Sequence, residues 1–306
     1  MKIVRSCVIP DASFLTEINP SRFLRRPILV SSLWLVLTSA YGQSLPDQLT
    51  AYLQKLPATV RVSLAVEALQ SGSEPASTPA FFYQAHVPVP SASLIKIPVL
   101  IEAMEWVKAG RLDPDEIYIL VDSDKVGGSG VLAAYPSRSR IAYRDLITLM
   151  ITHSDNTATN ILIQEIGFEV INQRMQSLGL THTRLNRMMM DTTAVKRGID
   201  NYVAACELNT LLKKMAGYEL STPALCREMI TMLKQNDDTL TIPRLLPKSV
   251  AVAHKTGKLT YVRGDAGIVY ARRPFVLSVL VQGTSTEEAE RIIGEIALIC
   301  YQFFEQ

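Results

Sequence analysis

Strand-like patterns stand near both ends of this 306-residue chain, and a long helical stretch separates them. In the first of these patterns, Val60, Val62, Leu64 and Val66 alternate with less apolar residues, which is the period of a half-buried strand. The same reasoning predicts five strands in all, at residues 60–66, 81–83, 250–258, 266–271 and 275–282, the last two joined by a turn at 272–274. Strands at both ends of the chain, with helices between them, indicate that the two ends meet in one sheet. We therefore expect a single antiparallel sheet.

Apolar residues in the middle of the chain recur at helical spacing. Helices are expected around residues 93–110, 146–151, 161–166 and 208–215, and a terminal helix should begin after the capping candidate Ser285. The predicted fold class is α/β: an antiparallel sheet flanked by the terminal helices, plus an all-helical lobe. We assign residues 43–90 and 245–306 to the sheet lobe and 91–244 to the helical lobe. The cleft between two lobes is the default place for a site.

The first 42 residues have the pattern of a targeting segment. Arg22, Arg25 and Arg26 precede a short apolar run at residues 28–37, and small residues follow at 40–42. This pattern predicts a signal peptide at 1–42 and a periplasmic or secreted protein, with an uncleaved membrane anchor as the alternative. The segment carries five basic and two acidic residues, so its removal changes the formal net charge from +2 to −1. A nearly neutral chain lacks the positive charge that nucleic-acid binding requires, so this class of function is excluded.

Cysteines and histidines show no metal-binding spacing. Cys7 would leave with the signal peptide, and Cys206, Cys226 and Cys300 are expected to be small buried residues, with a Cys206–Cys226 disulfide as the alternative. The glycine cluster at 127–130 lacks the spacing of a phosphate-binding loop and is interpreted as a flexible turn. We expect no metal, no cofactor and a monomer.

A Ser-x-x-Lys motif begins the first middle helix, with Ser93 three residues before Lys96. Residues three apart on a helix share a face, so the two side chains can lie together. A serine hydroxyl is a weak nucleophile until a neighbouring base takes its proton, and a desolvated lysine beside other cations can be that base. The motif alone is common by chance in a chain of this length.

Two further motifs follow in a fixed order. Ser154, Asp155 and Asn156 stand at the end of a helix, and Lys255, Thr256 and Gly257 stand on a predicted strand. Together with the Ser-x-x-Lys motif they form the set typical of class A β-lactamases and penicillin-binding proteins. The chain resembles this family over nearly all of its length after residue 45, and the resemblance implies the same α/β fold.

The resemblance also implies a role for each motif residue. Ser93 would be the nucleophile and Lys96 its base, and Ser154 would pass a proton to the leaving nitrogen. The residues expected to bind substrate are Asn156, Lys255, Thr256, Gly257 and Lys258, with backbone N–H groups of Ser93 and Lys258 as the oxyanion hole. Asp155 is expected to be structural. Arg263 is the nearest candidate for a carboxylate-binding arginine on the neighbouring strand, although its side chain could instead face solvent.

One position departs from the family pattern. Class A β-lactamases carry a glutamate in the omega loop that activates the deacylating water, and Met189 stands at that place here, with Thr192 and Thr193 where leucine and asparagine are expected. A thioether cannot accept a proton from water. Asp191 is the nearest carboxylate, and it is a candidate base or a partner of Arg187.

Three functions share acylation of Ser93. The preferred one is a β-lactamase-like hydrolase that opens β-lactam amides, with impaired deacylation. The alternatives are a D-alanyl-D-alanine peptidase, or another acyl-serine hydrolase, and a penicillin-binding sensor module that stays acylated. In each case the partner is a small β-lactam or a peptidoglycan peptide.

Overall fold

The computed structural model describes residues 44–69 and 80–306. The predicted signal peptide at 1–42 and the turn-rich loop at 71–79 lie outside the described residues. The assignment of the two lobes by residue number and the export of the protein stay predictions.

Five strands form one antiparallel sheet in the order β2-β1-β9-β8-β7. They are β1 (Arg61–Ala68), β2 (Ala80–Tyr83), β7 (Val252–Leu259), β8 (Val262–Val269) and β9 (Phe275–Gln282). Strand β1 pairs with β9 over its full length, and Leu64 lies opposite Val279. The predicted meeting of the two chain ends in one sheet is confirmed, and β7 is an edge strand.

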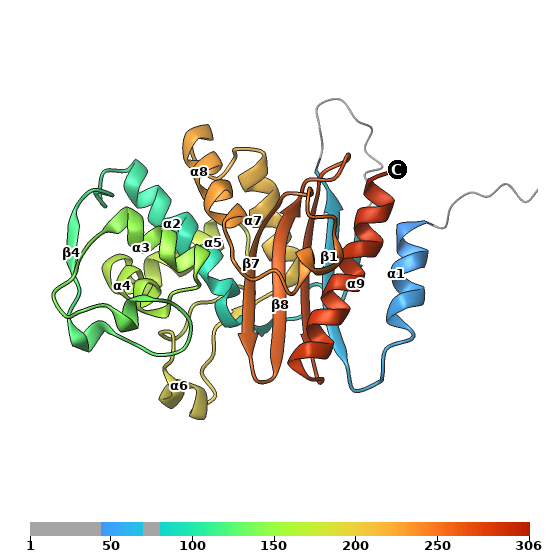
Figure 1. Ribbon diagram of the computed structural model, residues 1–306, viewed down its shortest axis with the longest axis horizontal. Coiled ribbons are helices and arrows are strands. Elements are labelled where there is room, and N and C mark those ends of the chain that lie inside the picture. Colours follow the sequence, from blue (N-terminus) through green and yellow to red (C-terminus); the bar gives the residue numbers. More distant parts are fainter. Residues whose placement is uncertain (1–43, 70–79) are drawn as a thin grey trace, which may run out of the picture. The chain divides into compact units, whose positions relative to one another are not determined.

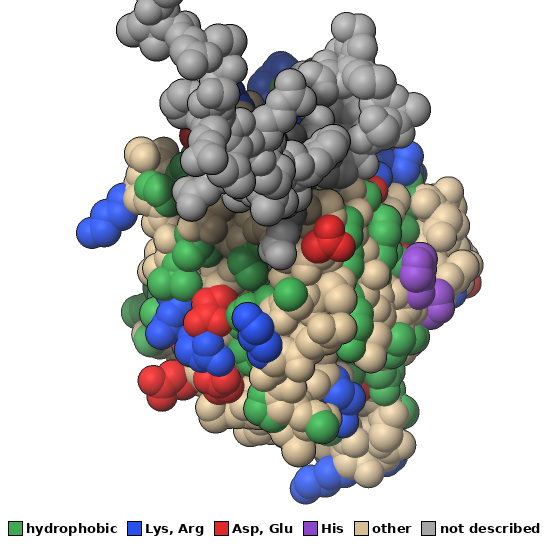
Figure 2. Space-filling view, turned by 90° about the vertical axis from the view of Figure 1, so that its right-hand side faces the viewer, with side chains coloured by type: hydrophobic (Ala, Val, Ile, Leu, Met, Phe, Trp, Pro, Cys, Tyr) green, Lys and Arg blue, Asp and Glu red, His purple; other side chains and the backbone are tan. Residues whose placement is uncertain are grey.

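Two terminal helices cover one face of the sheet, α1 (Leu45–Leu53) and α9 (Thr286–Phe304), which lie side by side in Figure 1. Their apolar sides and this face of the sheet form one hydrophobic cluster. Ser285 caps α9 as predicted, because its hydroxyl accepts from the Glu288 N–H at 3.2 Å. On the outer side of α9, Arg291 pairs with Glu288 and Glu295, and Figure 2 shows acidic and basic side chains next to one another on this face.

The other face of the sheet packs against helices through a second, larger cluster. The helices of this region are α2 (Lys96–Lys108), α3 (Tyr143–Thr152), α4 (Asn156–Ile166), α5 (Phe168–Ser177), α6 (Thr192–Lys196), α7 (Ala205–Ala216) and α8 (Pro223–Lys234), with 3-10 turns η1 (Ala92–Ile95), η2 (Asp122–Asp124), η3 (Leu132–Ala134) and η4 (Ile242–Leu245). Helix α7 packs directly on β1, β8 and β9. The first nine residues of α2 are all buried, so this helix is the centre of the helical region.

The helical region is not entirely helical, which corrects one prediction. Strands β4 (Ile117–Ile119) and β5 (Arg140–Ala142) pair with each other inside it, and β6 (Tyr202–Val203) pairs with β3 (Val89–Pro90), which directly precedes that region. These strands have two or three residues each, too few to show a period in the sequence. Pairing between distant loops forms them.

Cys206, Cys226 and Cys300 are free thiols, so the alternative of a Cys206–Cys226 disulfide is wrong. Cys226 and Cys300 are buried as expected, whereas Cys206 is half-buried with its Sγ 3.1 Å from Nδ1 of His86. Within residues 44–69 and 80–306 no helix is long and apolar enough to cross a membrane.

Candidate active site

A cavity of about 420 Å³ lies where η1 and the start of α4 approach the end of β7. The predicted nucleophile Ser93 lines it together with Asn156, Met189, Asp191 and Lys258. The remaining lining residues are Ala92, Gly128, Ser129, Arg187, Met190, Thr192, Val195, Lys196, Leu259 and Tyr261. The lining residues come from five separate stretches of the chain. Only the tertiary fold brings these stretches together around one cavity.

Lys96 is fully buried beneath this cavity. Its Nζ donates to the Ser154 carbonyl oxygen at 2.6 Å, to Ser154 Oγ at 3.1 Å and to Asn156 Oδ1 at 2.9 Å. Burial and then the nearby charge of Lys255 lower the pKa of Lys96 well below its ordinary value, against the opposite effect of Asp155. The structure therefore joins the first two motifs through a lysine that loses its proton more readily than a free one.

The turn between α3 and α4 holds the second motif in place. Ser154 has a left-handed backbone with φ of 52°, which directs its side chain and its carbonyl group toward Lys96. Asn156 donates from Nδ2 to the Gly127 carbonyl oxygen at 3.0 Å, which fixes the glycine cluster against the site. A Cβ atom at Gly128 would lie 2.7 Å from that Nδ2, so only glycine fits there. The cluster interpreted as a flexible turn is a wall of the cavity.

Asp155 is buried and structural, as predicted. One carboxylate oxygen accepts from the Ala158 N–H and caps α4 at 2.9 Å, and the other accepts from the N–H groups of Val131 at 2.6 Å and Leu132 at 2.8 Å. The side chain therefore ties the loop at residues 127–132 to the start of α4.

Replacing Asp155 with alanine is expected to lower the free energy of unfolding by about 2–4 kcal/mol, because it removes a helix cap and leaves the half-buried Val131 N–H and the buried Leu132 N–H unpaired. Urea denaturation of the variant and the wild type measures the difference. The matched control is Asp122→Ala, which removes an exposed aspartate whose surface ion pair with Lys125 contributes little, so the variant should change little. Equal losses in the two variants would contradict the role of Asp155.

The third motif brings the sheet edge against η1. A Cβ atom at Gly257 would lie 3.0 Å from the Ser91 carbonyl oxygen and 3.1 Å from Ala92 Cβ. Ala92, the residue before Ser93, has a left-handed backbone with φ of 46°. The glycine thus permits the close approach that places Ser93 beside the end of β7, and Ala92 turns the chain there.

Lys255 is fully buried, and its Nζ donates to the Thr256 carbonyl oxygen at 2.9 Å. Burial lowers the pKa of Lys255 to about 8, with Asp265 and Asp238 opposing that shift. A positive charge held out of water beside the cavity can attract an anionic group of a ligand.

Arg263 does not face solvent, so that alternative is wrong. Its Nε lies 3.0 Å from Glu290 Oε1 on α9, its Nη2 lies 2.7 Å from Asp238 Oδ2, and its Nη1 donates to the Gly257 carbonyl oxygen at 3.4 Å. Two carboxylates already neutralise this guanidinium. Burial raises the pKa of Asp238, but the ion pair with Arg263 outweighs burial and lowers the pKa overall. Asp238 stands in no motif of the sequence, and it reaches Arg263 only through the tertiary fold.

The loop at residues 187–192 forms the opposite wall. Asn160 on α4 fixes Met189 by accepting from its N–H at 2.8 Å and donating to its carbonyl oxygen at 3.1 Å. Arg187 pairs with Asp200, with Nη2 2.7 Å from Oδ1, rather than with Asp191. Asp191 accepts from the Ala194 N–H at 2.8 Å and caps α6. Among the lining residues of the described chain, Asp191 is the only carboxylate.

Comparison with known proteins identifies the family of this chain. Residues 44–304 match the family described as the beta-lactamase enzyme family. The chain belongs to the beta-lactamase enzyme family. The family resemblance inferred from the three motifs is thereby confirmed, and the protein is a β-lactamase-like serine hydrolase or penicillin-binding protein with the class A fold.

Two relatives match this beta-lactamase family member over most of their length. The extended-spectrum beta-lactamase PER-1 from Pseudomonas aeruginosa is 26% identical over 237 residues, covering 70% of this chain and 75% of PER-1. The solved structure of PBP-A superposes with a TM-score of 0.77 at 27% identity, covering 85% of this chain and 96% of PBP-A.

Two further solved structures extend the comparison. A mutant of PBP-A has been solved as an acyl-enzyme complex with penicillin G, and this chain superposes on it with a TM-score of 0.76 at 27% identity, covering 85% of this chain and 96% of the mutant chain. The beta-lactamase from Sphaerobacter thermophilus superposes with a TM-score of 0.78 at 26% identity, covering 84% of this chain and 97% of that one.

Proposed function

We propose that this member of the beta-lactamase family opens β-lactam amides through an acyl-Ser93 intermediate and releases the product slowly. The observation that carries the proposal is the wall of the Ser93 cavity, where Met189 lies and where the nearest carboxylate, Asp191, caps a helix. The family and the penicillin G complex of a relative support β-lactams as the ligand class.

Acylation needs a nucleophile, a base and a proton donor, and the site offers all three. Ser93 Oγ would attack the lactam carbonyl carbon while its proton passes to Lys96, which is poised by its lowered pKa. The tetrahedral intermediate would collapse as the carbon–nitrogen bond breaks, and Ser154, hydrogen-bonded to Lys96, would protonate the leaving nitrogen. Lys255 and Thr256 would bind the ligand carboxylate, and Asn156 its amide side chain.

Deacylation needs a base for water, and the candidates near the cavity are poor ones. Met189 is 6% exposed and offers only a thioether at the place expected for the omega-loop glutamate. The Asp191 oxygen that accepts from Ala194 is already committed to the cap of α6. Loss of a general base costs roughly 10²- to 10⁴-fold in rate, so release should be the slow step.

We expect the wild-type protein to accumulate an acyl-enzyme with excess benzylpenicillin, because acylation retains its base and deacylation does not. Intact-mass measurement during the incubation, in parallel with a hydrolysis assay, separates the two steps. Rapid turnover with no detectable adduct would contradict the proposal.

Two substitutions then identify the base. Met189→Glu restores a carboxylate and should recover part of the lost turnover, although the altered neighbours Thr192 and Thr193 leave its orientation imperfect. Asp191→Asn keeps the size of the side chain and its capping oxygen, so it should leave turnover unchanged if Asp191 is only a cap. If the wild type turns over and this variant stalls, Asp191 is the base.

A D-alanyl-D-alanine peptidase is the second candidate, and the similarity to PBP-A over 85% of the chain favours it. The acylation chemistry is the same, and the acyl donor is a peptide in place of a lactam. Release of D-alanine from a D-alanyl-D-alanine peptide, followed under the same conditions as benzylpenicillin hydrolysis, distinguishes the two.

We also propose that the protein is exported, because its expected substrates are outside the cytoplasm and residues 1–42 have the pattern of a signal peptide. Protein recovered from its host should begin near Gln43 and should be outside the cytoplasm. N-terminal sequencing of fractionated cells measures this, and a cytoplasmic protein that keeps Met1 would refute it.

A further inference from the structure

Asp238, in the loop after α8, lies among the residues expected to bind the ligand carboxylate. Its Oδ2 is 2.7 Å from Nη2 of Arg263. The Thr256 side chain is also hydrogen-bonded to the Asp238 carboxylate, and the negative charge of Asp238 acts on Lys255. One acidic side chain of the protein therefore interacts with all three groups that a ligand carboxylate would use.

The loop that carries Asp238 is held against the site. Asp238 Oδ1 accepts from the Leu240 N–H at 3.2 Å, which leaves Oδ2 to Arg263. The nitrogen of the preceding residue, Asp237, lies 3.5 Å from the Thr152 carbonyl oxygen at the end of α3, just before the second motif. Asp238 is thus positioned between the second and third motifs.

Every nitrogen of Arg263 already has a partner in the protein. Nε pairs with Glu290, Nη2 pairs with Asp238, and Nη1 donates to the Gly257 carbonyl oxygen. Arg263 is 3% exposed and Thr256 is 5% exposed, whereas the Asp238 side chain is 26% exposed. Asp238 is therefore the member of this group that solvent reaches most easily.

The charges around Thr256 cancel without a ligand. Lys255 and Arg263 carry two positive charges. Asp238 and Glu290 carry two negative ones, and both pair with Arg263. A ligand carboxylate brought to the same place would be repelled by the Asp238 carboxylate. A carboxamide is uncharged, and it has an N–H that can donate to Asp238 and an oxygen that can accept from Thr256 or Lys255.

We propose that Asp238 determines the specificity of the Ser93 site: it takes the place of the ligand carboxylate, so the site prefers an uncharged amide there. A ligand carboxylate can still reach Lys255, but Asp238 removes its advantage over the amide. In a peptide ligand, the preferred leaving residue has an amidated or peptide-bonded carboxyl group in place of a free terminal carboxylate. This inference rests on the proposed function, because it concerns the ligand of the same site.

Benzylpenicillin and its carboxamide, which differ only in this group, test the preference. In a Ser93→Ala background no acyl-Ser93 forms, and a ligand-observed NMR titration measures the binding of each. Protein with Asp238 should bind the carboxamide at least as tightly as benzylpenicillin. With Asp238→Asn the preference should reverse, and benzylpenicillin should bind about tenfold more tightly than the carboxamide, because the like-charge repulsion is gone.

Two results would overturn the proposal. One is a preference for benzylpenicillin, or no saturable binding of either ligand, in the protein that keeps Asp238, which is measured whether or not the Asp238→Asn variant folds. The other is a preference that Asp238→Asn leaves unchanged.

Acylation of the protein that keeps Ser93 separates this inference from the proposed function. Intact-mass measurement at several ligand concentrations should show the same reversal in the concentration that gives the half-maximal rate, with the maximal rate little changed. If neither ligand acylates Ser93 while binding to the Ser93→Ala protein still reverses, the proposed function fails and the role of Asp238 stands.

Asp237→Asn is the matched control. It removes one negative charge from an exposed neighbour, whose effect on Lys255 is smaller than that of Asp238. The ligand preference of this variant should stay within about twofold of the parent protein, because exposed charges are screened. A reversal as large as that of Asp238→Asn would overturn the assignment to Asp238.

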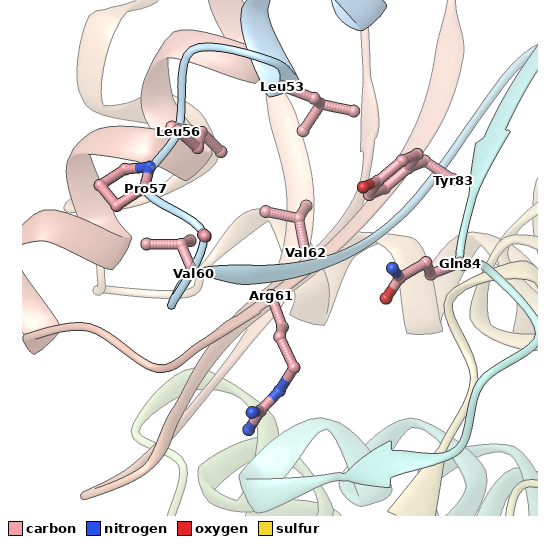
Figure 3. Close-up of a pocket in the computed structure, with 9 residues that line it drawn as sticks. Leu53, Leu56, Pro57, Val60, Arg61, Val62, Tyr83 and Gln84 are labelled. Atoms are coloured by element: carbon pink, nitrogen blue, oxygen red, sulfur yellow. The ribbon is translucent and has the colours of Figure 1, made fainter.

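A distant arginine gives a second control. Arg61 borders a separate cavity of about 240 Å³ at the start of β1, and Figure 3 shows its guanidinium pointing away from Leu53, Val60 and Val62. Combining Arg61→Gln with Asp238→Asn should leave the gained preference for benzylpenicillin intact. Loss of that preference would place the carboxylate at Arg61 and refute the proposal.

Discussion

Replacing Ser93 with alanine is expected to abolish covalent labelling by penicillins, because the serine Oγ is the one atom proposed to bond to the ligand carbonyl. The hydroxyl is on a half-buried turn, so its removal should change the free energy of unfolding by no more than about 1 kcal/mol. Intact-mass measurement after incubation with benzylpenicillin shows the adduct directly.

Ser129→Ala is the matched control. Ser129 lines the same cavity and also carries a hydroxyl, but it lies outside the Ser-x-x-Lys motif, so its variant should still be labelled. An adduct that persists on Ser93→Ala, or one that disappears on Ser129→Ala alone, would move the nucleophile to another residue.

Lys96→Ala and Lys96→Arg should both slow acylation by about 10²- to 10⁴-fold, the usual effect of losing a general base. Arginine keeps the positive charge but does not lose its proton in proteins, so it separates a base from a structural cation. Stopped-flow labelling with a chromogenic β-lactam measures the rates. Near wild-type acylation in Lys96→Arg would assign Lys96 a purely electrostatic role.

The pH dependence of acylation follows from the same two lysines. Lys96 acts as a base only when neutral, so the rate should fall as pH decreases through its lowered pKa. Lys255 must stay charged to attract a carboxylate, so the rate should also fall as pH rises past the Lys255 pKa of about 8. Lys255→Arg keeps its charge and should remove only the alkaline decline. An alkaline decline that persists in this variant would come from another group.

Local patterns predicted much of the fold, because regular strands and helices have a period that a short window shows. The two-residue strands β3 and β6 have no period, and neither do β4 and β5, so only the folded chain brings them together. Helix α1 was also not located by its pattern, since its nine residues contribute only two buried leucines.

The part of the site that belongs to the three motifs was predictable from the sequence. Lys96 is hydrogen-bonded to Ser154 and Asn156, and Ser93 lines one cavity with Asn156. The charge of Lys255 acts on Lys96, and Gly257 packs against the turn before Ser93. The partners of Arg263 were not predictable, because Asp238 is 25 residues away and Glu290 is 27 residues away, in elements with no motif. For the same reason the sequence gives no sign that Asp155 binds the loop at residues 127–132, or that Asn160 fixes Met189.

The left-handed backbone at Ala92 and Ser154 lowers the stability of the fold at two positions of the proposed site. Each non-glycine residue in this conformation costs about 1–2 kcal/mol. Here Ala92 directly precedes the proposed nucleophile, and Ser154 is the proposed proton donor. A glycine at either position would relax the chain, but at 154 it would also remove the hydroxyl that contacts Lys96. At residue 154, a change that relieves the backbone would therefore also remove the proposed proton donor.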